Sequence, residues 1–292
     1  LSPMEFIKKA FKWLIKQRQN HSPHSDIWEL RLTKEKRLPQ IASQIKNGTY
    51  QLSPIKRIEI KGKETSLWSS EDSLVLKTIT LILEKKRSPH LSSSCSHLKG
   101  NGGAKFAIRD TFKKMKHFKF VMKSDVKSYY ASIDHFTLYK QFCNLVREPS
   151  LRRLVWQYLK RTVEWGGTYK DIERGISLGC PLSPLMAALY LKPLDVAMDA
   201  ASQKLGVYYV RFMDDWVVMT DSRHKLRRVV KTVNQVLNQL KVEKHPDKTY
   251  IGRIKDSGFK FLGYVLRPEV NKGQRQHKRL QPAPDTLKRC QD

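Results

Sequence analysis

The chain has 292 residues, of which 40% are hydrophobic and 10% aromatic, so it can fold around one large core or two smaller ones. It carries 56 Lys and Arg against 27 Asp and Glu, a net charge of +29, which indicates a polyanionic partner, nucleic acid first. The four cysteines are far apart, which argues against a zinc knuckle or a disulfide framework. Without a bilayer-spanning apolar stretch or a signal-peptide pattern, the sequence predicts a cytoplasmic protein with no membrane partner.

The first part of the chain is predicted to be mainly helical. Apolar residues recur every three to four positions in four stretches, and these predict helices at 3–19, 33–47, 70–86 and 104–116. Residues 55–63 alternate apolar and basic side chains, which predicts a basic hairpin. The Ser/Gly-rich stretch 92–104 is predicted to be a loop, and it lacks the Gly-Lys-Ser/Thr ending of a P-loop.

The rest of the chain mixes strands with helices. Alternating patterns predict a strand at 119–126, two strands around a turn within 206–220, and a last strand at 259–266. Helical patterns occupy most of 135–163, then 184–203 and 223–240. The sum is an α+β fold with an antiparallel sheet backed by helices.

Three aspartates are out of keeping with so basic a chain. Asp125 closes the predicted strand 119–126, and Asp214 and Asp215 lie at the turn between the two strands of 206–220. A turn explains one Asp, but two adjacent carboxylates repel each other unless a cation binds them. Oxygen ligands of this kind suit Mg²⁺, and metal-assisted phosphoryl transfer on nucleic acid is the reaction that they favour.

Five motifs in order resemble those of reverse transcriptases, most closely the bacterial enzymes of the group II intron-like, retron-like and phage-defence branch. They cover 123–135 (motif A), 175–185 (motif B), Phe212-Met213-Asp214-Asp215 (motif C), and Lys248-Thr249 followed by 259–264 (motifs D and E). Each motif is weak alone, and the set is specific because all five occur in the family order.

The resemblance implies a right-hand polymerase with fingers, an antiparallel palm sheet backed by helices, and a truncated thumb. The corresponding domains are N-terminal helices and fingers at 1–118, palm at 119–134, connecting helices at 135–174, palm at 175–266, and the start of a thumb or linker at 267–292.

The resemblance also implies a catalytic centre. Asp125, Asp214 and Asp215 would be catalytic and would hold two Mg²⁺ ions, or Mn²⁺, together with the backbone carbonyl of Val126. Lys248 would lie near the triphosphate and protonate the departing pyrophosphate.

Further residues would contact the nucleotide and the primer. The nucleotide-binding set would be Tyr130 as steric gate against the ribose 2′-hydroxyl, Gly179, Lys61 and Lys63; the primer grip would be Phe261, Leu262, Gly263 and Tyr264. Two departures from the family pattern stand out. Leu178 replaces a common Gln, and the stretch around Lys61 lacks the expected Arg.

The expected function is an RNA-directed DNA polymerase, with RNA template, DNA or RNA primer, dNTPs and a cognate non-coding RNA as candidate partners. An RNA-directed RNA polymerase and a non-catalytic nucleic-acid-binding palm scaffold remain as alternatives. Tyr130 argues against the first, and the intact aspartate set argues against the second, because buried unpaired carboxylates are costly without a metal.

Overall fold

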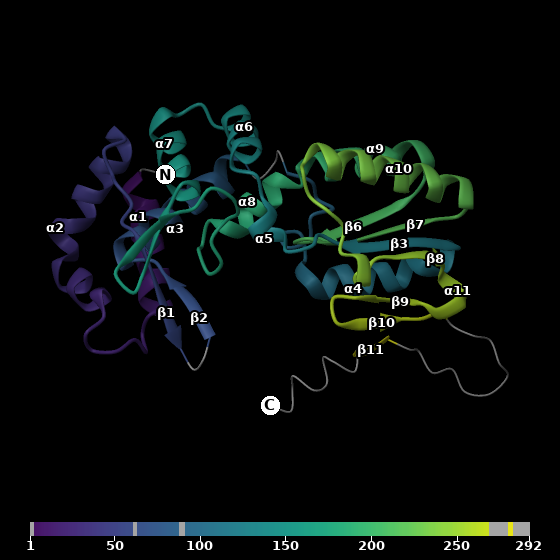
Figure 1. Ribbon diagram of the computed structural model, residues 1–292, viewed down its shortest axis with the longest axis horizontal. Helices are drawn as coiled ribbons and strands as arrows, with labels where there is room; N and C mark the ends of the chain where they lie inside the picture. Colours follow the sequence, from purple (N-terminus) through teal and green to yellow (C-terminus); the bar gives the residue numbers. More distant parts are fainter. Residues whose placement is uncertain (1–2, 61–62, 88–90, 269–279, 283–292) are drawn as a thin grey trace. The chain divides into compact units, whose positions relative to one another are not determined.

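A computed structural model describes residues 3–60, 63–87, 91–268 and 280–282 of the chain (Figure 1). Contacts divide it into two compact units, each treated by itself below. The first unit comprises Leu1–His90 and Tyr130–Leu189, and the second comprises Leu91–Tyr129 and Tyr190–Asp292. This division differs from the sequence-based one, since it groups 91–118 with the second unit and 175–189 with the first. The functional division into fingers, palm and thumb stays a prediction.

The first unit is mostly helical. Its helices are α1 (Pro3–Gln17), α2 (Asp26–Asn47), α3 (Ser70–Arg87), α5 (Tyr129–Ser132, which starts in the second unit), α6 (His135–Leu145), α7 (Pro149–Leu159) and α8 (Ser183–Tyr190, which ends in the second unit). Helix α1 packs on α2 and α3 through a face that includes Ile7, Ala10 and Leu14, all fully buried or nearly so. Helix α2 ends where the sequence predicts, because Gly48 adopts the left-handed conformation that closes a helix.

A four-stranded sheet completes the first unit, in the order β2-β1-β4-β5. The predicted basic hairpin is present as β1 (Ile55–Ile60) and β2 (Lys63–Leu67), and it is joined in parallel by β4 (Thr162–Trp165), which pairs with β5 (Thr168–Asp171). The hairpin β4–β5 begins in the last two residues of the stretch 135–163, which is predicted to be mostly helical, and no strand is predicted there. Its strands have four residues each; β4 is mostly half-buried and β5 is exposed, so they carry little hydrophobic alternation.

The second unit contains an antiparallel sheet with the strand order β6-β7-β3-β8. Its strands are β3 (Phe120–Asp125), β6 (Tyr208–Phe212), β7 (Asp215–Thr220) and β8 (Tyr250–Arg253). Strands β3 and β7 read as near-continuous buried runs because both faces of the sheet are covered. Helices α9 (Lys192–Leu205) and α10 (Arg223–Gln239) pack on one face (Figure 1).

The other face of this sheet packs on helix α4 (Gly103–Lys114) and on strand β9 (Phe259–Phe261). A buried cluster that includes Val121, Val217, Met219 and Phe261 fills the space between them. Three short elements, η2 (Met115–His117), η3 (Pro246–Lys248) and α11 (Ile254–Ser257), connect the larger ones. The observed α+β architecture, an antiparallel sheet backed by helices, confirms the predicted fold class.

Three predicted elements are wrong in detail. The helix expected at 33–47 begins seven residues earlier, at Asp26. The single strand expected at 259–266 is a hairpin of β9 and β10 (Tyr264–Leu266), to which β11 (Leu280–Pro282) adds a third strand. The helix expected at 184–203 is interrupted at Leu191, where the chain passes from α8 to α9. Within the described ranges, no helix has the length and apolar character needed to cross a membrane.

Candidate active site

The three aspartates of motifs A and C come together in the second unit at one end of the sheet β6-β7-β3-β8. Asp125 is the last residue of β3 and Asp215 is the first residue of β7, and the two are direct cross-strand partners. Asp214 lies in the two-residue turn that joins β6 to β7. The hydrogen-bonded register therefore fixes the carboxylate cluster, without help from a flexible loop.

Two lysines neutralise part of this cluster. Because side chains alternate between the faces of a strand, Lys123 and Asp125 share a face with Asp215. The Lys123 ammonium lies 3.4 Å from Asp215 Oδ1, and both side chains are largely buried. Lys248, at the end of η3, donates a hydrogen bond of 3.0 Å to Asp125 Oδ2, and its side chain is 58% exposed. Motif D is thus brought to motif A, whereas Lys123 has no role in the sequence reading.

The environment favours the protonated form of two of the carboxyls. Burial raises the pKa of Asp215 to about 7, although the nearby Lys123 ammonium works in the opposite direction. Burial also raises the pKa of Asp214, and the charge of Asp125 adds to that effect. The hydrogen bond to Asp125 raises the pKa of Lys248, so this ammonium stays charged. Ionisation of the three carboxyls is therefore unfavourable in the metal-free protein, and a bound cation would favour it.

The donor set fits a divalent cation that also binds substrate. Asp125 Oδ1 is buried and accepts no hydrogen bond, and Asp215 Oδ1 likewise has only the ion pair with Lys123. In the part of the chain that the structure describes, no three or more His, Cys, Asp or Glu side chains form a ready-made metal cage. Mg²⁺ does not need one, since it is held by one or two carboxylates plus substrate phosphates and water.

The Val126 backbone, the fourth predicted ligand, adjoins this cluster. An isolated antiparallel bridge joins Val126 to Lys244, and it is formed by the Asp125 carbonyl and the Lys127 amide. Its two bonds are His245 N–H to Asp125 O at 2.8 Å and Lys127 N–H to Glu243 O at 2.9 Å. Neither bond of the bridge uses the Val126 carbonyl, which directly follows Asp125 in the chain.

The raised pKa of Asp215 predicts that this carboxylate destabilises the metal-free protein at neutral pH. An unfolded aspartate ionises near pH 4, whereas folded Asp215 keeps its proton to about pH 7. Between these values the folded state binds more protons, so stability falls as pH rises and the loss is complete above pH 7. We expect Asp215→Asn to stabilise the chelated protein at pH 8, on the order of 2–4 kcal/mol, and much less at pH 5.

Thermal or urea unfolding in EDTA at both pH values checks this expectation. Asp221→Asn is the matched control, because Asp221 follows the same strand and is exposed. An equal effect of Asp215→Asn at pH 5 and pH 8 would contradict the electrostatic account.

All four predicted nucleotide-binding residues belong to the first unit. Tyr130 lies on α5, half-buried, and its carbonyl accepts a hydrogen bond from the Ile176 amide. Gly179 has a left-handed φ of +74°, and an added Cβ would meet nothing within 4 Å, so its backbone conformation requires glycine while the space beside it stays open. The roles assigned to both residues stay predictions.

Gly175 is a constrained glycine of motif B that the sequence reading left without a role. A Cβ there would lie 2.8 Å from the Tyr130 carbonyl oxygen and 2.9 Å from Ala131 Cα. Motif B therefore lies against the part of motif A that belongs to the first unit, and only glycine permits this approach.

The structure describes the two predicted finger lysines only in part, and it describes the predicted primer grip in full. Lys61 lies outside the described residues, and only the backbone of Lys63, the first residue of β2, is described. The predicted primer grip, Phe261 to Tyr264, is the β9–β10 turn; its central residues Leu262 and Gly263 have φ of +47° and +80°. Positive φ at both positions matches a type I′ hairpin turn. The Phe261 ring is fully buried in the core, and the role of the turn as a primer grip stays a prediction.

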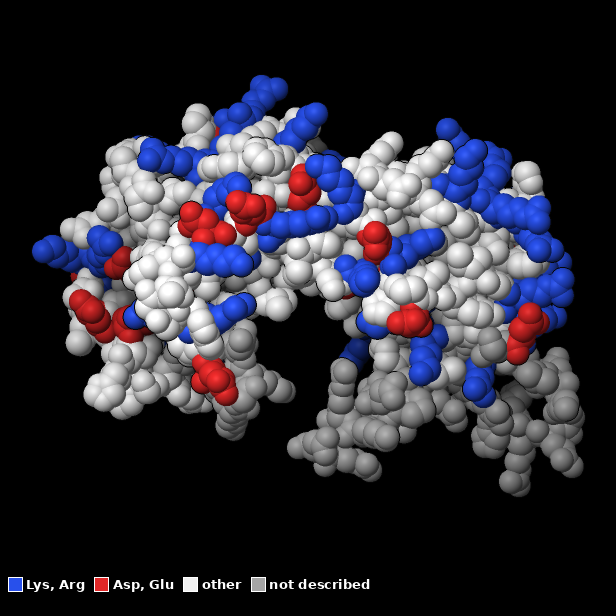
Figure 2. Space-filling view, viewed as in Figure 1, with Lys and Arg blue, Asp and Glu red and all other residues white. Residues whose placement is uncertain are grey.

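Basic side chains are widespread on the surface, as the view in Figure 2 shows. In the second unit they gather on α10, which carries the exposed Arg223, Arg227, Arg228 and Lys231. Such a surface attracts a phosphodiester backbone through charge and does not by itself read sequence.

Comparisons with known proteins identify distant relatives of the chain. The chain is 23% identical to the group II intron-encoded protein LtrA of Lactococcus lactis subsp. cremoris over 167 aligned residues. This alignment covers 55% of this chain and 28% of LtrA. It is 20% identical over 308 residues to the protein YkfC of Escherichia coli K12, covering 90% of this chain and 80% of YkfC. The chain thus spans less than a third of the length of LtrA.

A solved structure shares the fold. The apo telomerase from Candida tropicalis, truncated from the C-terminal domain, superposes with a TM-score of 0.56 at 13% identity, covering 72% of this chain and 52% of that one. Residues 65–266 match the profile described as reverse transcriptase (RNA-dependent DNA polymerase). This span is more than half of the chain and contains every motif from A to E, so the chain belongs to the reverse transcriptase family.

Proposed function

We propose that this chain is an RNA-directed DNA polymerase that extends a primer by metal-dependent nucleotidyl transfer. The observation that carries the proposal is the cross-strand pairing of Asp125 with Asp215 beside the turn that bears Asp214. The buried oxygens of Asp125 and Asp215 that accept no hydrogen bond support it, because a structural carboxylate would have acquired a donor.

The three aspartates would hold two Mg²⁺ ions, or Mn²⁺, with the Val126 carbonyl as a further ligand. When bound, such ions lower the pKa of an attacking hydroxyl and stabilise a leaving pyrophosphate. Lys123 keeps the Asp215 carboxylate partly compensated while the site is empty of substrate. Lys248 is exposed enough to reach a phosphate and, with its raised pKa, carries a proton to donate.

The proposed partners follow from the same site and from the charge of the chain. They are an RNA template, a DNA or RNA primer and dNTPs, with Lys61 and Lys63 as candidate triphosphate contacts. The similarity to LtrA favours a group II intron-like enzyme, and a retron or defence role with a cognate non-coding RNA is a second candidate within the same family.

Sugar selection distinguishes this proposal from an RNA-directed RNA polymerase. If Tyr130 is the steric gate, replacing its ring with Ala opens space for a ribose 2′-hydroxyl. We expect Tyr130→Ala to incorporate rNTPs at least tenfold better relative to dNTPs than the wild type does, an effect of about 1.4 kcal/mol. Single-nucleotide insertion kinetics measure the ratio, and Tyr169→Ala, on an exposed strand, is the control. An unchanged ratio would mean that Tyr130 only packs.

Primer extension tests the function as a whole. The purified chain, with an RNA template annealed to a DNA primer, dNTPs and Mg²⁺, should lengthen the primer and stop on addition of EDTA. Extension with rNTPs only would support an RNA polymerase. Tight binding of the hybrid without extension in Mg²⁺ or Mn²⁺ would support the non-catalytic scaffold.

A further inference from the structure

The turn that carries Asp214 has an unusual backbone. Met213, the residue before Asp214, has a φ of +56°, a left-handed conformation that costs a non-glycine residue roughly 1 kcal/mol. Both polar groups of its backbone are engaged by side chains. Its amide donates to His97 Nδ1 at 2.9 Å, and its carbonyl accepts from Arg211 Nη1 at 2.5 Å. The strained residue is therefore held at both ends.

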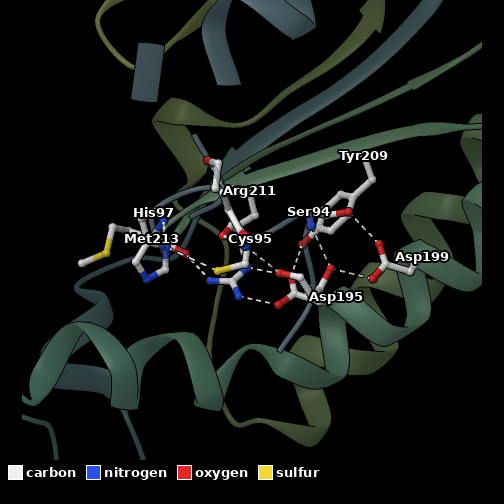
Figure 3. A network of polar contacts seen from close by, with 11 residues as sticks. Ser94, Cys95, His97, Asp195, Asp199, Tyr209, Arg211 and Met213 are labelled. Atoms are coloured by element: carbon white, nitrogen blue, oxygen red, sulfur yellow. Dashed lines mark hydrogen bonds and ion pairs between the residues drawn. The ribbon is translucent and has the colours of Figure 1, made fainter. Parts of the chain in front are cut away.

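Arg211 is fixed in turn by a buried network on the α9 side of the sheet (Figure 3). Its Nε and Nη2 donate to the two carboxylate oxygens of Asp195 at 2.7 and 2.5 Å. Tyr209 donates from its hydroxyl to Asp195 Oδ1 at 2.7 Å. Arg211 and Asp195 have no exposed surface, so the fork geometry of the pair leaves the guanidinium one orientation. In that orientation, Nη1 of Arg211 points at the Met213 carbonyl.

His97 lies at the end of the loop from Ser92 to His97, which is fixed by contacts of its own. Its backbone pairs with β6, since Arg211 N–H donates to Ser94 O at 2.9 Å and Ser96 N–H donates to Arg211 O at 2.7 Å. The hydroxyls of Ser92 and Ser94 donate to the Asp199 carboxylate of α9 at 2.6 and 2.8 Å. This serine-rich loop is therefore a fixed part of the second unit.

We infer that His97 and Arg211 are positioning residues that hold the Met213–Asp214 turn and so aim the Asp214 carboxylate. The inference rests on the proposed function for the importance of Asp214. Neither His97 nor Arg211 belongs to motifs A to E. Neither residue needs to touch substrate. Their effect is geometric, and an error of about 1 Å in such a site lowers the rate about 10²-fold.

The hydrogen bond dictates which replacement should work. Because His97 Nδ1 accepts the Met213 amide proton, the ring proton lies on Nε2. An Asn side chain places a carbonyl oxygen near the Nδ1 position and keeps the acceptor. A Leu side chain has similar bulk and no acceptor. The pair His97→Asn and His97→Leu thus separates the hydrogen bond from packing.

The experiment combines primer-extension kinetics with hydrogen exchange in the metal-free protein. We expect His97→Leu to lower kcat 10- to 100-fold with the KM for dNTP changed less than threefold, and to speed exchange in the peptide that contains the Met213 amide. His97→Asn should restore both to within fivefold of wild type. His224→Leu, an exposed histidine on α10, is the control. If wild-type protein extends no primer, the proposed function fails, while exchange still reports on the turn. Wild-type exchange in His97→Leu, or equal loss of kcat in the Asn and Leu variants, would overturn the inference.

Discussion

Asp214→Asn is expected to lower primer extension by more than about 10³-fold in Mg²⁺. Losing a single electrostatic hydrogen-bond donor from an active site already costs about 10²–10³-fold, and this substitution removes a charged metal ligand. Asn preserves the size of the side chain, and burial already raises the pKa of Asp214, so the variant should fold at least as well as the wild type. Single-turnover extension with a pre-bound primer–template measures the chemical step.

The control for Asp214→Asn is Asp221→Asn. It removes the same charge from the other end of β7, where the side chain is exposed. Binding of the RNA–DNA hybrid should be similar in both variants. Extension by Asp214→Asn within tenfold of wild type would remove Asp214 from the site and, with it, the main support for a polymerase.

Asp195→Asn is expected to destabilise the protein by about 3–5 kcal/mol, because it leaves the Arg211 guanidinium buried without its counter-charge. Burial alone lowers the pKa of Arg211, and the Asp195 carboxylate more than reverses this, so the pair is stable only as a pair. The expected loss corresponds to a fall in Tm of roughly 6–15 °C. Denaturant unfolding at constant pH measures it.

Two comparisons make the Asp195 prediction specific. Asp199→Asn, one turn later on α9, removes one of the two oxygens that accept from Ser92 and Ser94, and it should cost about 1–2 kcal/mol. The double replacement Asp195→Leu with Arg211→Met should recover much of the stability, because apolar side chains replace a buried ion pair well. A loss under 1 kcal/mol in Asp195→Asn would show that Arg211 is solvated in solution.

The sequence predicts the parts of this molecule that depend on local periodicity. Alternation along 119–126 and 206–220 was enough to place Asp125 at a strand end and Asp214 in a turn. The family motifs then suggested that the carboxylates meet, and the β3–β7 register brings Asp125 and Asp215 together. The helix that ends at Gly48 was predicted on the same kind of local signal.

Features that depend on distant contacts were not predictable in this way. His97 and Met213 are 116 positions apart, and nothing in a serine-rich loop marks it as the partner of motif C. The buried Arg211 reads as one more basic residue in a chain with 56 Lys and Arg. The β9–β10 hairpin was read as one strand because its turn contains Leu262, which seldom adopts positive φ.

The ion pairs Lys123–Asp215 and Lys248–Asp125 bear on whether metal must bind before nucleic acid. Lys123 and Lys248 offset Asp215 and Asp125, so three carboxylates leave one formal negative charge at this end of the sheet. A cluster of three bare carboxylates would repel an approaching phosphate chain, whereas this one is close to neutral before any cation binds. We therefore expect a template–primer duplex to bind without prior metal occupancy, with comparable affinity in EDTA and in Mg²⁺ at matched ionic strength.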